Sequence, residues 1–429
     1  MNYNETIEYL YNAAPAFTKV GAVAYKEGLD NTLSLDEHAG HPHRHFLTVH
    51  VAGTNGKGSC SHSLAAILQE CGMKVGLFTS PHLVTFRERI RVNGKMIPKE
   101  YVVEWVAKNR EFFEKLSPSF FELSTAMAFE YFRDMAVDIA VVEVGLGGRL
   151  DCTNIITPLL SVITNISFDH TQFLGNTLAE IAREKAGIIK PGVPVVIGET
   201  TEETREVFTR TAAERNASIV FAEDSVIPLD VDYELKGTYQ TKNLNTVLHC
   251  LLPLARALKE RGFRVKDATG KVRTALTHVC KTTGLQGRWQ TILHEPLVIC
   301  DTGHNVAGWK YLTKQIAETA EKRRLERGKD VTLRMVFGMV DDKDIDTVTG
   351  ILPRNATYYF TQASTHRAIP AQRVMEKAKA HGLHGSCHDS VEKAYCAARQ
   401  ASTADDVIFV GGSSYVVADF LSNLKEETD

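Results

Sequence analysis

Residues 51–59 read VAGTNGKGS, a glycine-rich turn that contains one lysine and one serine. Glycine lets a backbone approach an anion closely, and the start of a following helix adds partial positive charge. Lys57 is then placed to reach the outer phosphates of a nucleotide, and the Ser59 hydroxyl is placed to ligate Mg²⁺. The turn therefore predicts an ATP phosphate site, made of Gly53, Thr54, Asn55, Gly56, Lys57, Gly58 and Ser59.

The turn differs from the common P-loop pattern at one position. That pattern has Ser or Thr directly after the lysine, whereas here Gly58 separates Lys57 from Ser59. The alternative is a glycine-rich turn between a strand and a helix that binds no ligand. That alternative would not explain a lysine and a hydroxyl at the mouth of the same turn, so we favour the ATP site.

The elements that position this turn can also be read from the sequence. The apolar run 46–51 indicates a buried strand, and residues 59–70 have the 3.6-residue periodicity of a helix. Strand and helix patterns alternate along most of the chain, which is typical of parallel sheets covered by helices. Further strands are expected at 74–80, 138–146, 160–166, 193–198 and 218–223. Further helices are expected near 98–115, 122–134, 176–187, 202–214 and 243–258.

A second α/β cycle begins at residue 296. Its strands are expected at 296–305, 332–339, 356–363 and 406–413. Because 429 residues exceed the usual size of a single core, we predict two domains, 1–295 and 296–429. The charged stretch 321–330 is interpreted as a solvated helix end and loop.

Composition excludes several classes of protein. Hydrophobic residues make up 44% of the chain and charged residues 24%, as in an ordinary globular protein, and a net charge of −3 gives no reason to expect nucleic acid or an anionic membrane as a partner. The first residues carry no basic or long apolar signal, and no apolar run has the length of a membrane span. The eight cysteines are scattered, and five read as reduced core residues: Cys60, Cys71, Cys152, Cys250 and Cys300. We therefore expect a cytoplasmic protein.

Polar clusters follow several of the expected strands, where open α/β sheets place their ligands. Glu143 ends an apolar strand and is followed by a glycine-rich loop, so its hard anionic oxygens suit Mg²⁺. Two alternatives are a carboxylate that caps the glycine turn and one that pairs with Arg149. His170 taken alone is more typical of a structural histidine, and Lys185 taken alone of a charge on a helix surface.

Five strings together resemble one family closely. They are VAGTNGKGS (51–59), FTSPHL (78–83), EVGLGGRLDCTN (143–154), DHTQFLGNTLAEIAREKAGIIKPG (169–192) and DTGHN (301–305). In this order they resemble the folylpolyglutamate synthase/dihydrofolate synthase family, a branch of the Mur ligase superfamily. The resemblance covers nearly the whole chain and is densest between residues 49 and 192.

This resemblance implies a fold and a reaction. The fold class is α/β, with an N-terminal P-loop ATPase domain on a parallel-rich sheet and a smaller, Rossmann-like C-terminal domain. The family uses ATP to phosphorylate a carboxylate of dihydropteroate or of a folate. The amino group of L-glutamate then attacks the acyl phosphate, and an amide, ADP and phosphate result.

The metal ligands are implied by the same resemblance. Ser59, Ser80 and Glu143 match positions that hold one Mg²⁺, and His170 and Lys185 match positions that serve a second. The family's lysine there is carbamylated, and a plain ammonium group cannot coordinate a cation. Lys57, His170 and Lys185 are thus the residues expected to support catalysis.

Further ATP contacts are implied at Gln240 and Asn243, although the family's histidine before the glutamine is Tyr239 here. Arg288 matches an arginine that reaches the phosphates, and the acidic residue that the family has two places later is Gln290 here.

DTGHN matches the family's D-G-A-H-N string. Asp301 at a strand end suits binding of a ribose or of a substrate ammonium group. His304 would approach the phosphates from the second domain.

The folate side is implied by a loop from Pro81 through Arg91, with Pro81, His82, Phe86 and Arg87 as its candidate residues. Phe86 is a candidate for stacking on a pterin, while Arg87 has a solvated side chain as its alternative. Asp151 either hydrogen-bonds the amino groups of a pterin or caps a helix.

Two other functions stay open at this point. One is another ATP-dependent amide ligase of the superfamily, such as an enzyme of cell-wall precursor synthesis. The other is a P-loop switch or nucleotide-binding protein without catalysis, although no N-K-x-D string for guanine is present. The sequence leaves the acceptor undecided, and we expect a monomer by similarity to the family.

Overall fold

The apolar run that precedes the glycine-rich turn becomes a central strand of an eight-stranded sheet. The order of strands is β4-β3-β2-β5-β1-β6-β7-β8. Strands β2, β5, β1, β6, β7 and β8 are parallel, while β3 and β4 add antiparallel pairs at one edge. The strands are β1 (Leu47–Ala52), β2 (Val75–Phe78), β3 (Ile90–Val92), β4 (Lys95–Met96), β5 (Ile139–Glu143), β6 (Leu160–Ile163), β7 (Val195–Ile197) and β8 (Ile219–Phe221).

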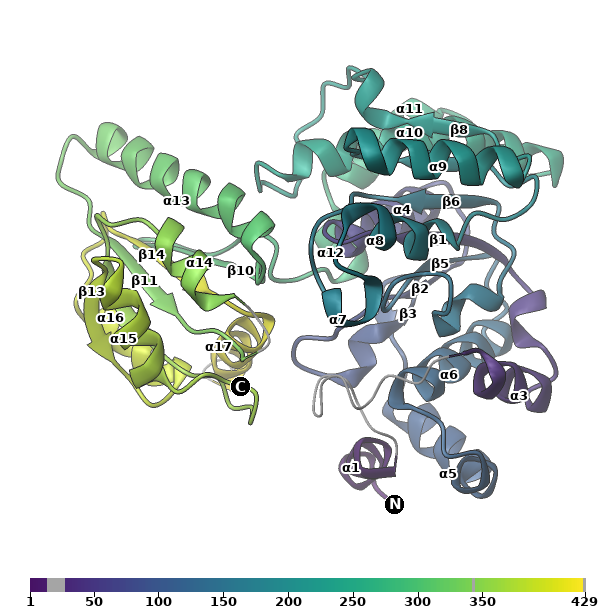
Figure 1. The fold of residues 1–429 in the computed structure, drawn as a ribbon, viewed down its shortest axis with the longest axis horizontal. Helices are drawn as coiled ribbons and strands as arrows, with labels where there is room; N and C mark the ends of the chain where they lie inside the picture. Colours follow the sequence, from purple (N-terminus) through teal and green to yellow (C-terminus); the bar gives the residue numbers. More distant parts are fainter. Residues whose placement is uncertain (14–27, 342–343, 427–429) are drawn as a thin grey trace. The chain divides into compact units, whose positions relative to one another are not determined.

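This computed structural model describes residues 1–13, 28–341 and 344–426, and the chain divides into two compact units (Figure 1). Unit 1 comprises Met1–Glu234 and Gln240–Leu285, and unit 2 comprises Leu235–Tyr239 and Gln286–Asp429. Unit 2 therefore begins before the expected boundary at 295/296. One strand before that boundary, β9 (Gln290–His294), pairs with β10 (Leu297–Asp301) and so belongs to unit 2. The sequence did not predict β9, because it is half-exposed and has no apolar run.

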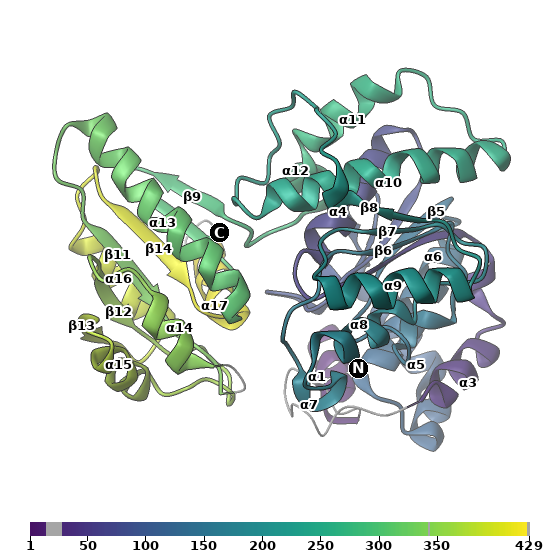
Figure 2. The same ribbon diagram turned by 45° about the horizontal axis from the view of Figure 1, so that its top comes forward.

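Helices cover both faces of the first sheet, which explains why its inner strands are buried along their whole length. Figure 2 shows α9 and α10 on opposite sides of β6 and β7. The helices of unit 1 are α1 (Tyr3–Ala13), α3 (Asp30–His38), α4 (Lys57–Glu70), α5 (Lys99–Leu116), α6 (Phe120–Asp134), α7 (Thr171–Leu174), α8 (Leu178–Ala186), α9 (Glu202–Glu214), α10 (Gln240–Glu260), α11 (Ala268–Leu276) and α12 (Val279–Thr283). None of the described helices combines the length and the apolar character needed to cross a membrane.

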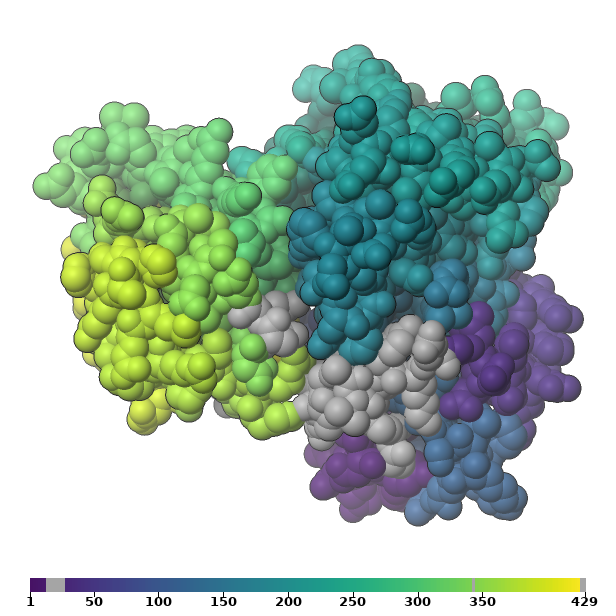
Figure 3. Space-filling model, viewed as in Figure 1, coloured from purple at the N-terminus to yellow at the C-terminus, as the bar shows by residue number. Residues whose placement is uncertain are grey.

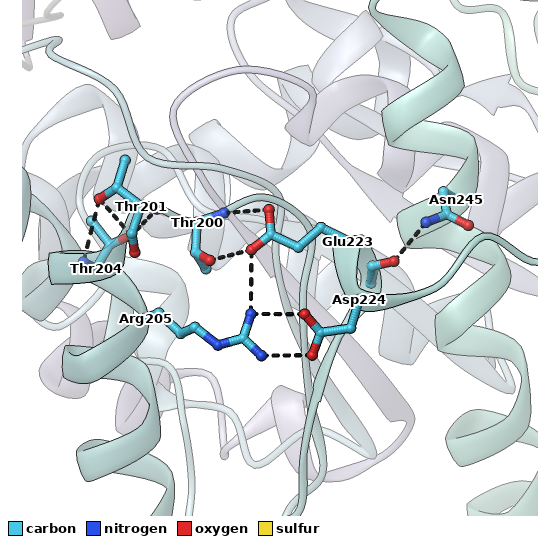
Figure 4. Close-up of polar contacts among 8 residues, drawn as sticks. Thr200, Thr201, Thr204, Arg205, Glu223, Asp224 and Asn245 are labelled. Atoms are coloured by element: carbon cyan, nitrogen blue, oxygen red, sulfur yellow. Dashed lines mark hydrogen bonds and ion pairs between the residues drawn. The ribbon is translucent and has the colours of Figure 1, made fainter.

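A polar network beside the edge strand β8 ties three elements of unit 1 together (Figure 4). Arg205 of α9 donates to both oxygens of Asp224, at 2.9 and 2.6 Å, and reaches Glu223. Asn245 of α10 donates to the backbone carbonyl of Ala222, at 2.7 Å. The network holds the turn at Ala222–Asp224, which follows β8, against α10. The first residues of α10 lie at the glycine-rich loop.

Unit 2 contains a six-stranded sheet in the order β13-β12-β11-β14-β10-β9, parallel except for the β9–β10 pair. Its further strands are β11 (Leu333–Phe337), β12 (Thr357–Phe360), β13 (His384–Cys387) and β14 (Val407–Gly411). Its helices are α13 (Val306–Arg327), α14 (Ile345–Ile351), α15 (Ala371–Ala380), α16 (Val391–Gln400) and α17 (Ser414–Glu426). The charged stretch 321–330 is the exposed end of α13 and the loop after it, at the upper left of Figure 3. The predicted α/β class, with two sheets, is confirmed.

Candidate functional site

The glycine-rich loop joins β1 to α4 and is crowded on both sides. Gly53 and Gly56 have φ angles of +144° and +87°. A Cβ at Gly53 would collide with the Thr164 hydroxyl, and one at Gly56 with the Asn243 side chain. Glycine is required at both positions by backbone conformation and by space.

Residues that follow β6 hold the loop in place. The Asn55 amide donates to Asn165 Oδ1 at 3.0 Å, and the Thr164 hydroxyl donates to the Asn55 carbonyl at 2.5 Å. The Ser167 amide donates to Thr54 Oγ1 at 3.0 Å. Thr54 and Asn55 thus fix the shape of the loop, and their contact with a nucleotide stays a prediction. Sequence reasoning missed Thr164, Asn165 and Ser167, whose only signal is their place just after a strand.

Lys57 is the first residue of α4 and lies across its own loop. Its Nζ donates to the carbonyls of Gly53 and Thr54, at 3.1 and 3.2 Å. The ammonium group is therefore held at the mouth of the turn, where the sequence predicted phosphate oxygens.

Gln240 and Asn243 lie in the first turn of α10, beside the first turn of α4. Gln240 Nε2 donates to Ser59 Oγ at 3.0 Å, and Asn243 Nδ2 donates to Gln240 Oε1 at 2.9 Å. All three residues are buried. The structure thus brings these two predicted residues to the loop from a distant part of the sequence.

We expect that an alanine at Gly56 will weaken nucleotide binding. Gly56→Ala would strain a positive φ, by about 1–2 kcal/mol, and would push Asn243 away from the loop. The KM for ATP should rise about tenfold or more. Gly72→Ala is the matched control, because Gly72 has a φ of +91° and no atom lies within 4 Å of the position that a Cβ would take there. Equal effects of the two variants on KM would contradict the prediction. Thermal melting of both variants measures the loss of stability that the positive φ causes in each.

Glu143 and Ser80 meet at the carboxyl ends of the neighbouring strands β5 and β2. Glu143 is buried, and its Oε2 accepts from the Ser80 amide at 3.1 Å. Arg149, the alternative partner of Glu143, instead donates through two N–H groups to Glu184, at 3.0 and 3.1 Å. Carboxylate and hydroxyl oxygens from Glu143, Ser80 and Ser59 are the hard donors that suit Mg²⁺, so the residues present fit such a cation.

Lys185 lies inside the protein, not on a helix surface. It is 4% exposed, and its Nζ donates to the Gly53 carbonyl at 2.9 Å, so it lies against the glycine-rich loop. Burial, followed by the charge of Lys57, lowers the pKa of Lys185 to about 7, while Asp169 and Asp151 oppose this shift. A substantial share of Lys185 is therefore a neutral amine near pH 7.

His170 is the N-cap residue directly before α7 and has the left-handed conformation, with φ of 50°. Its Nε2 lies 3.9 Å from Asp169 Oδ1, and its amide donates to the same oxygen at 3.0 Å. Asp169 thus acts on both His170 and Lys185. Within the described residues, no three His, Cys, Asp or Glu side chains form a group that could hold a metal ion.

The residues predicted for the folate side are largely engaged in internal contacts. His82 accepts from Arg89 Nε at 2.7 Å and contacts the Tyr11 hydroxyl at 3.0 Å. Pro81, just before it, is exposed. Phe86 is 3% exposed and packs edge-on against Phe120.

Arg87 and Asp151 complete this group. The Arg87 side chain is half-buried and donates to the carbonyl of Ile97 at 2.5 Å. Asp151 caps the short helix at Cys152–Ile155, where it accepts from the Thr153 amide at 3.0 Å. Its second oxygen accepts from the Leu146 amide at 2.9 Å. The capping alternative for Asp151 is thus present, and a pterin contact stays a prediction for all five residues.

Unit 2 gathers Arg288, Asp301 and His304 at the carboxyl end of β10. Arg288 donates to the Thr302 hydroxyl, and His304 Nδ1 lies 3.1 Å from the Thr302 carbonyl. Asp301 is buried and accepts from the Tyr239 hydroxyl at 2.7 Å. The three predicted residues therefore lie together, and Tyr239 is an addition that the sequence did not predict.

Comparison with known proteins agrees with both units. Residues 51–250 match the model of the Mur ligase middle domain, and residues 287–414 match the model described as Mur ligase, glutamate ligase domain. The chain is 32% identical over 444 residues to the folylpolyglutamate synthase of Lacticaseibacillus casei, covering 97% of each protein.

Two solved structures have the same fold along their whole length. Escherichia coli FolC in complex with DHPP and ADP matches with a TM-score of 0.84 and 28% identity, over 100% of this chain and 99% of that one. A bifunctional folylpolyglutamate synthase/dihydrofolate synthase with Mn, AMPPNP and L-glutamate bound matches with a TM-score of 0.80 and 26% identity, over 99% and 98%.

Proposed function

The chain belongs to the folylpolyglutamate synthase/dihydrofolate synthase family of Mur ligases, and we propose that it joins L-glutamate to dihydropteroate or to a folate (poly)glutamate. The observation that carries this proposal is the arrangement around Gly53. The carbonyl of this residue accepts from both Lys57 and Lys185, and Ser59, Gln240 and Glu143 lie buried on the neighbouring elements. A phosphate loop alone would need only the first of these lysines.

The proposed reaction needs an activated carboxylate. Transfer of a phosphoryl group from ATP to the acceptor carboxylate makes an acyl phosphate, and ADP leaves. The glutamate nitrogen then attacks the acyl carbon, and phosphate leaves as the amide forms. Such transfers depend on positioning and charge neutralisation more than on covalent chemistry by the protein.

The residues of the loop supply that positioning. Lys57 neutralises the outer phosphates, and the N–H groups at the start of α4 bind their oxygens. Ser59, Ser80 and Glu143 would hold Mg²⁺, which offsets phosphate charge when it is bound. Gln240 fixes the Ser59 hydroxyl, so the ligand geometry is held from two helices.

Lys185 is proposed to be carbamylated. The low pKa of its amine supplies the neutral form, whose nitrogen bonds to the carbon of CO₂ and loses one proton to solvent, so that the product is a carbamate with anionic oxygens. Together with His170 it would then bind a second divalent cation. The L-glutamate-bound and DHPP-bound relatives support the same two-substrate chemistry for this chain.

In unit 2, Arg288 and His304 are proposed to contact the phosphates, and Asp301 a ribose hydroxyl or a substrate ammonium. On the folate side, Pro81, His82, Phe86, Arg87 and Asp151 stay candidates. A cytoplasmic monomer is proposed as well, and sedimentation of the purified protein tests the oligomeric state.

The decisive experiment is phosphate release from Mg·ATP in the presence of L-glutamate. Dihydropteroate and a reduced folate monoglutamate are compared as acceptors, with omission of glutamate as the control. Release with both acceptors establishes a bifunctional enzyme, and release with one assigns that half of the activity. Release only with a UDP-linked muramoyl acceptor would support the other branch of the superfamily, and nucleotide binding without any turnover would support a binding protein.

A further inference from the structure

The segment 235–239 connects two parts of unit 1 in sequence but is built into unit 2. The side-chain amide of Gln315, a buried residue of α13, hydrogen-bonds this segment through both its oxygen and its nitrogen. Gln315 Oε1 accepts from the Thr238 amide at 2.7 Å, and Nε2 donates to the Lys236 carbonyl at 2.9 Å. The backbone that leads into Tyr239 is therefore fixed on unit 2.

The ring of Tyr239 is placed by contacts on this segment and on the core. A Cβ at Gly237 would lie 2.6 Å from Tyr239 Cε1, so the absence of a side chain at Gly237 makes room for the ring. The ring also packs against the hydrophobic core of unit 2. Its hydroxyl donates to Asp301 Oδ2 at 2.7 Å.

Asp301 is held by three donors. The Trp289 amide donates to Oδ2 at 2.7 Å, and the Gly303 amide donates to Oδ1 at 2.8 Å. The Tyr239 hydroxyl is the only one of the three that comes from a side chain. Trp289 directly precedes β9 and Gly303 follows β10, whereas Tyr239 comes from the distant segment 235–239.

We propose that Tyr239 is a positioning residue, whose hydroxyl fixes the orientation and the charge state of Asp301 for binding a hydrogen-bond donor of a substrate. The inference rests on the proposed function, in which Asp301 binds either a ribose hydroxyl or the ammonium group of glutamate. Both ligands need an ionised, correctly oriented carboxylate, and kinetics distinguish them.

The direction of the effect follows from the surroundings of Asp301. Burial raises the pKa of this carboxyl, while Arg288 and the hydrogen bonds from Tyr239, Gly303 and Trp289 oppose the rise. Among the described residues, the Cys300 thiol is a further titratable group that interacts with Asp301. Loss of the Tyr239 hydroxyl removes one stabiliser of the carboxylate, so Asp301 becomes protonated at a higher pH.

The test is Tyr239→Phe, which removes the hydroxyl and keeps the ring. The control is Tyr358→Phe, because Tyr358 is also buried in unit 2 and donates to a backbone carbonyl, that of Pro353, at 2.6 Å. Initial rates are measured against pH while ATP and L-glutamate are varied in turn. In Tyr239→Phe the acid limb of kcat/KM should move up by about one pH unit for the substrate that Asp301 binds. The control should keep the wild-type limb.

A second readout does not require turnover. The ¹³C carboxyl signal of Asp301, identified by its loss in Asp301→Asn, should titrate about one pH unit higher in Tyr239→Phe. Gly237→Ala, which displaces the ring, should move it in the same direction. An unchanged titration and unchanged pH profiles in Tyr239→Phe would overturn the inference. An inactive wild type with the expected shift in the titration would instead overturn the proposed function and leave the role of Tyr239 standing.

Discussion

Lys57→Ala is expected to reduce glutamate-dependent phosphate release by about a thousandfold or more. The ammonium group of Lys57 is the charge that the loop itself supplies at its mouth, where Nζ donates to the Gly53 and Thr54 carbonyls. Without it, the Thr54 carbonyl loses its lysine partner and the Gly53 carbonyl keeps Lys185, so less positive charge remains at the mouth of the loop for the incoming phosphates. Phosphate release and calorimetric titration with ATP measure the loss.

A matched control for this variant is Lys271 of α11, which contacts the last residue of α4. Lys271 Nζ donates to the Glu70 carbonyl at 3.0 Å, on an exposed surface, so Lys271→Ala removes a similar contact far from the loop. This control should retain the wild-type rate. Near wild-type turnover in Lys57→Ala, with ATP affinity intact, would show that the loop does not bind the transferred phosphates.

Lys185→Ala is expected to lose activity by a similar order of magnitude, because the carbamate oxygens would be removed from the cation site. Short carboxylic acids should restore part of the activity, since a carboxylate can occupy the space and supply the oxygens. Lys190→Ala is the control for this rescue, because Lys190 is also partly buried and donates to the Asn154 carbonyl at 2.7 Å. Rescue of both variants, or full activity of Lys185→Ala without additive, would contradict the carbamate.

The same proposal has a pH dependence of defined sign. CO₂ reacts with the neutral amine, and the pKa of Lys185 is about 7, so the modified fraction should rise as pH increases through this value. Wild-type enzyme depleted of CO₂ should therefore lose more activity at pH 6 than at pH 8, and bicarbonate should restore it. Mass spectrometry is unsuited to this labile group, whereas ¹³C-bicarbonate labelling followed by NMR detects the carbamate directly.

The elements with strong patterns were predictable from the sequence. Central parallel strands are buried on both faces and read as continuous apolar runs, so β5 and β14 lie within their expected ranges, and β1 (Leu47–Ala52) differs from the expected 46–51 by one residue at each end. Strands without that pattern were missed. β13 reads HGSC and is exposed throughout, and β4 has only two residues. Such edge strands are defined by pairing with a neighbour, which leaves little trace in their own sequence.

The candidate site likewise contains residues that a local sequence pattern predicts and residues that only long-range contacts place. Lys57 and Ser59 follow from a local string, whereas the contact of Lys185 with Gly53 spans 132 positions and that of Gln240 with Ser59 spans 181. Lys185 has no local signal that distinguishes it from a lysine on a helix surface. Only the folded helix α8 shows that its ammonium group is buried. The backbone that leads into Tyr239 is likewise held by a distant residue, because Gln315 on α13 accepts from the Thr238 amide.

The support of the glycine-rich loop has a consequence for how the chain is made. β1 and α4 are synthesised early, but the loop between them is completed by Asn165, by Lys185 and finally by Asn243 on α10. A ribosome-bound chain that ends before residue 240 contains the turn, Asn165 and Lys185, but lacks Gln240 and Asn243 of α10. Because domains fold as units and long-range contacts close last, nucleotide affinity should arise only after α10 has emerged. When nucleotide binding is measured on nascent chains arrested at increasing lengths, the affinity should appear in a single step.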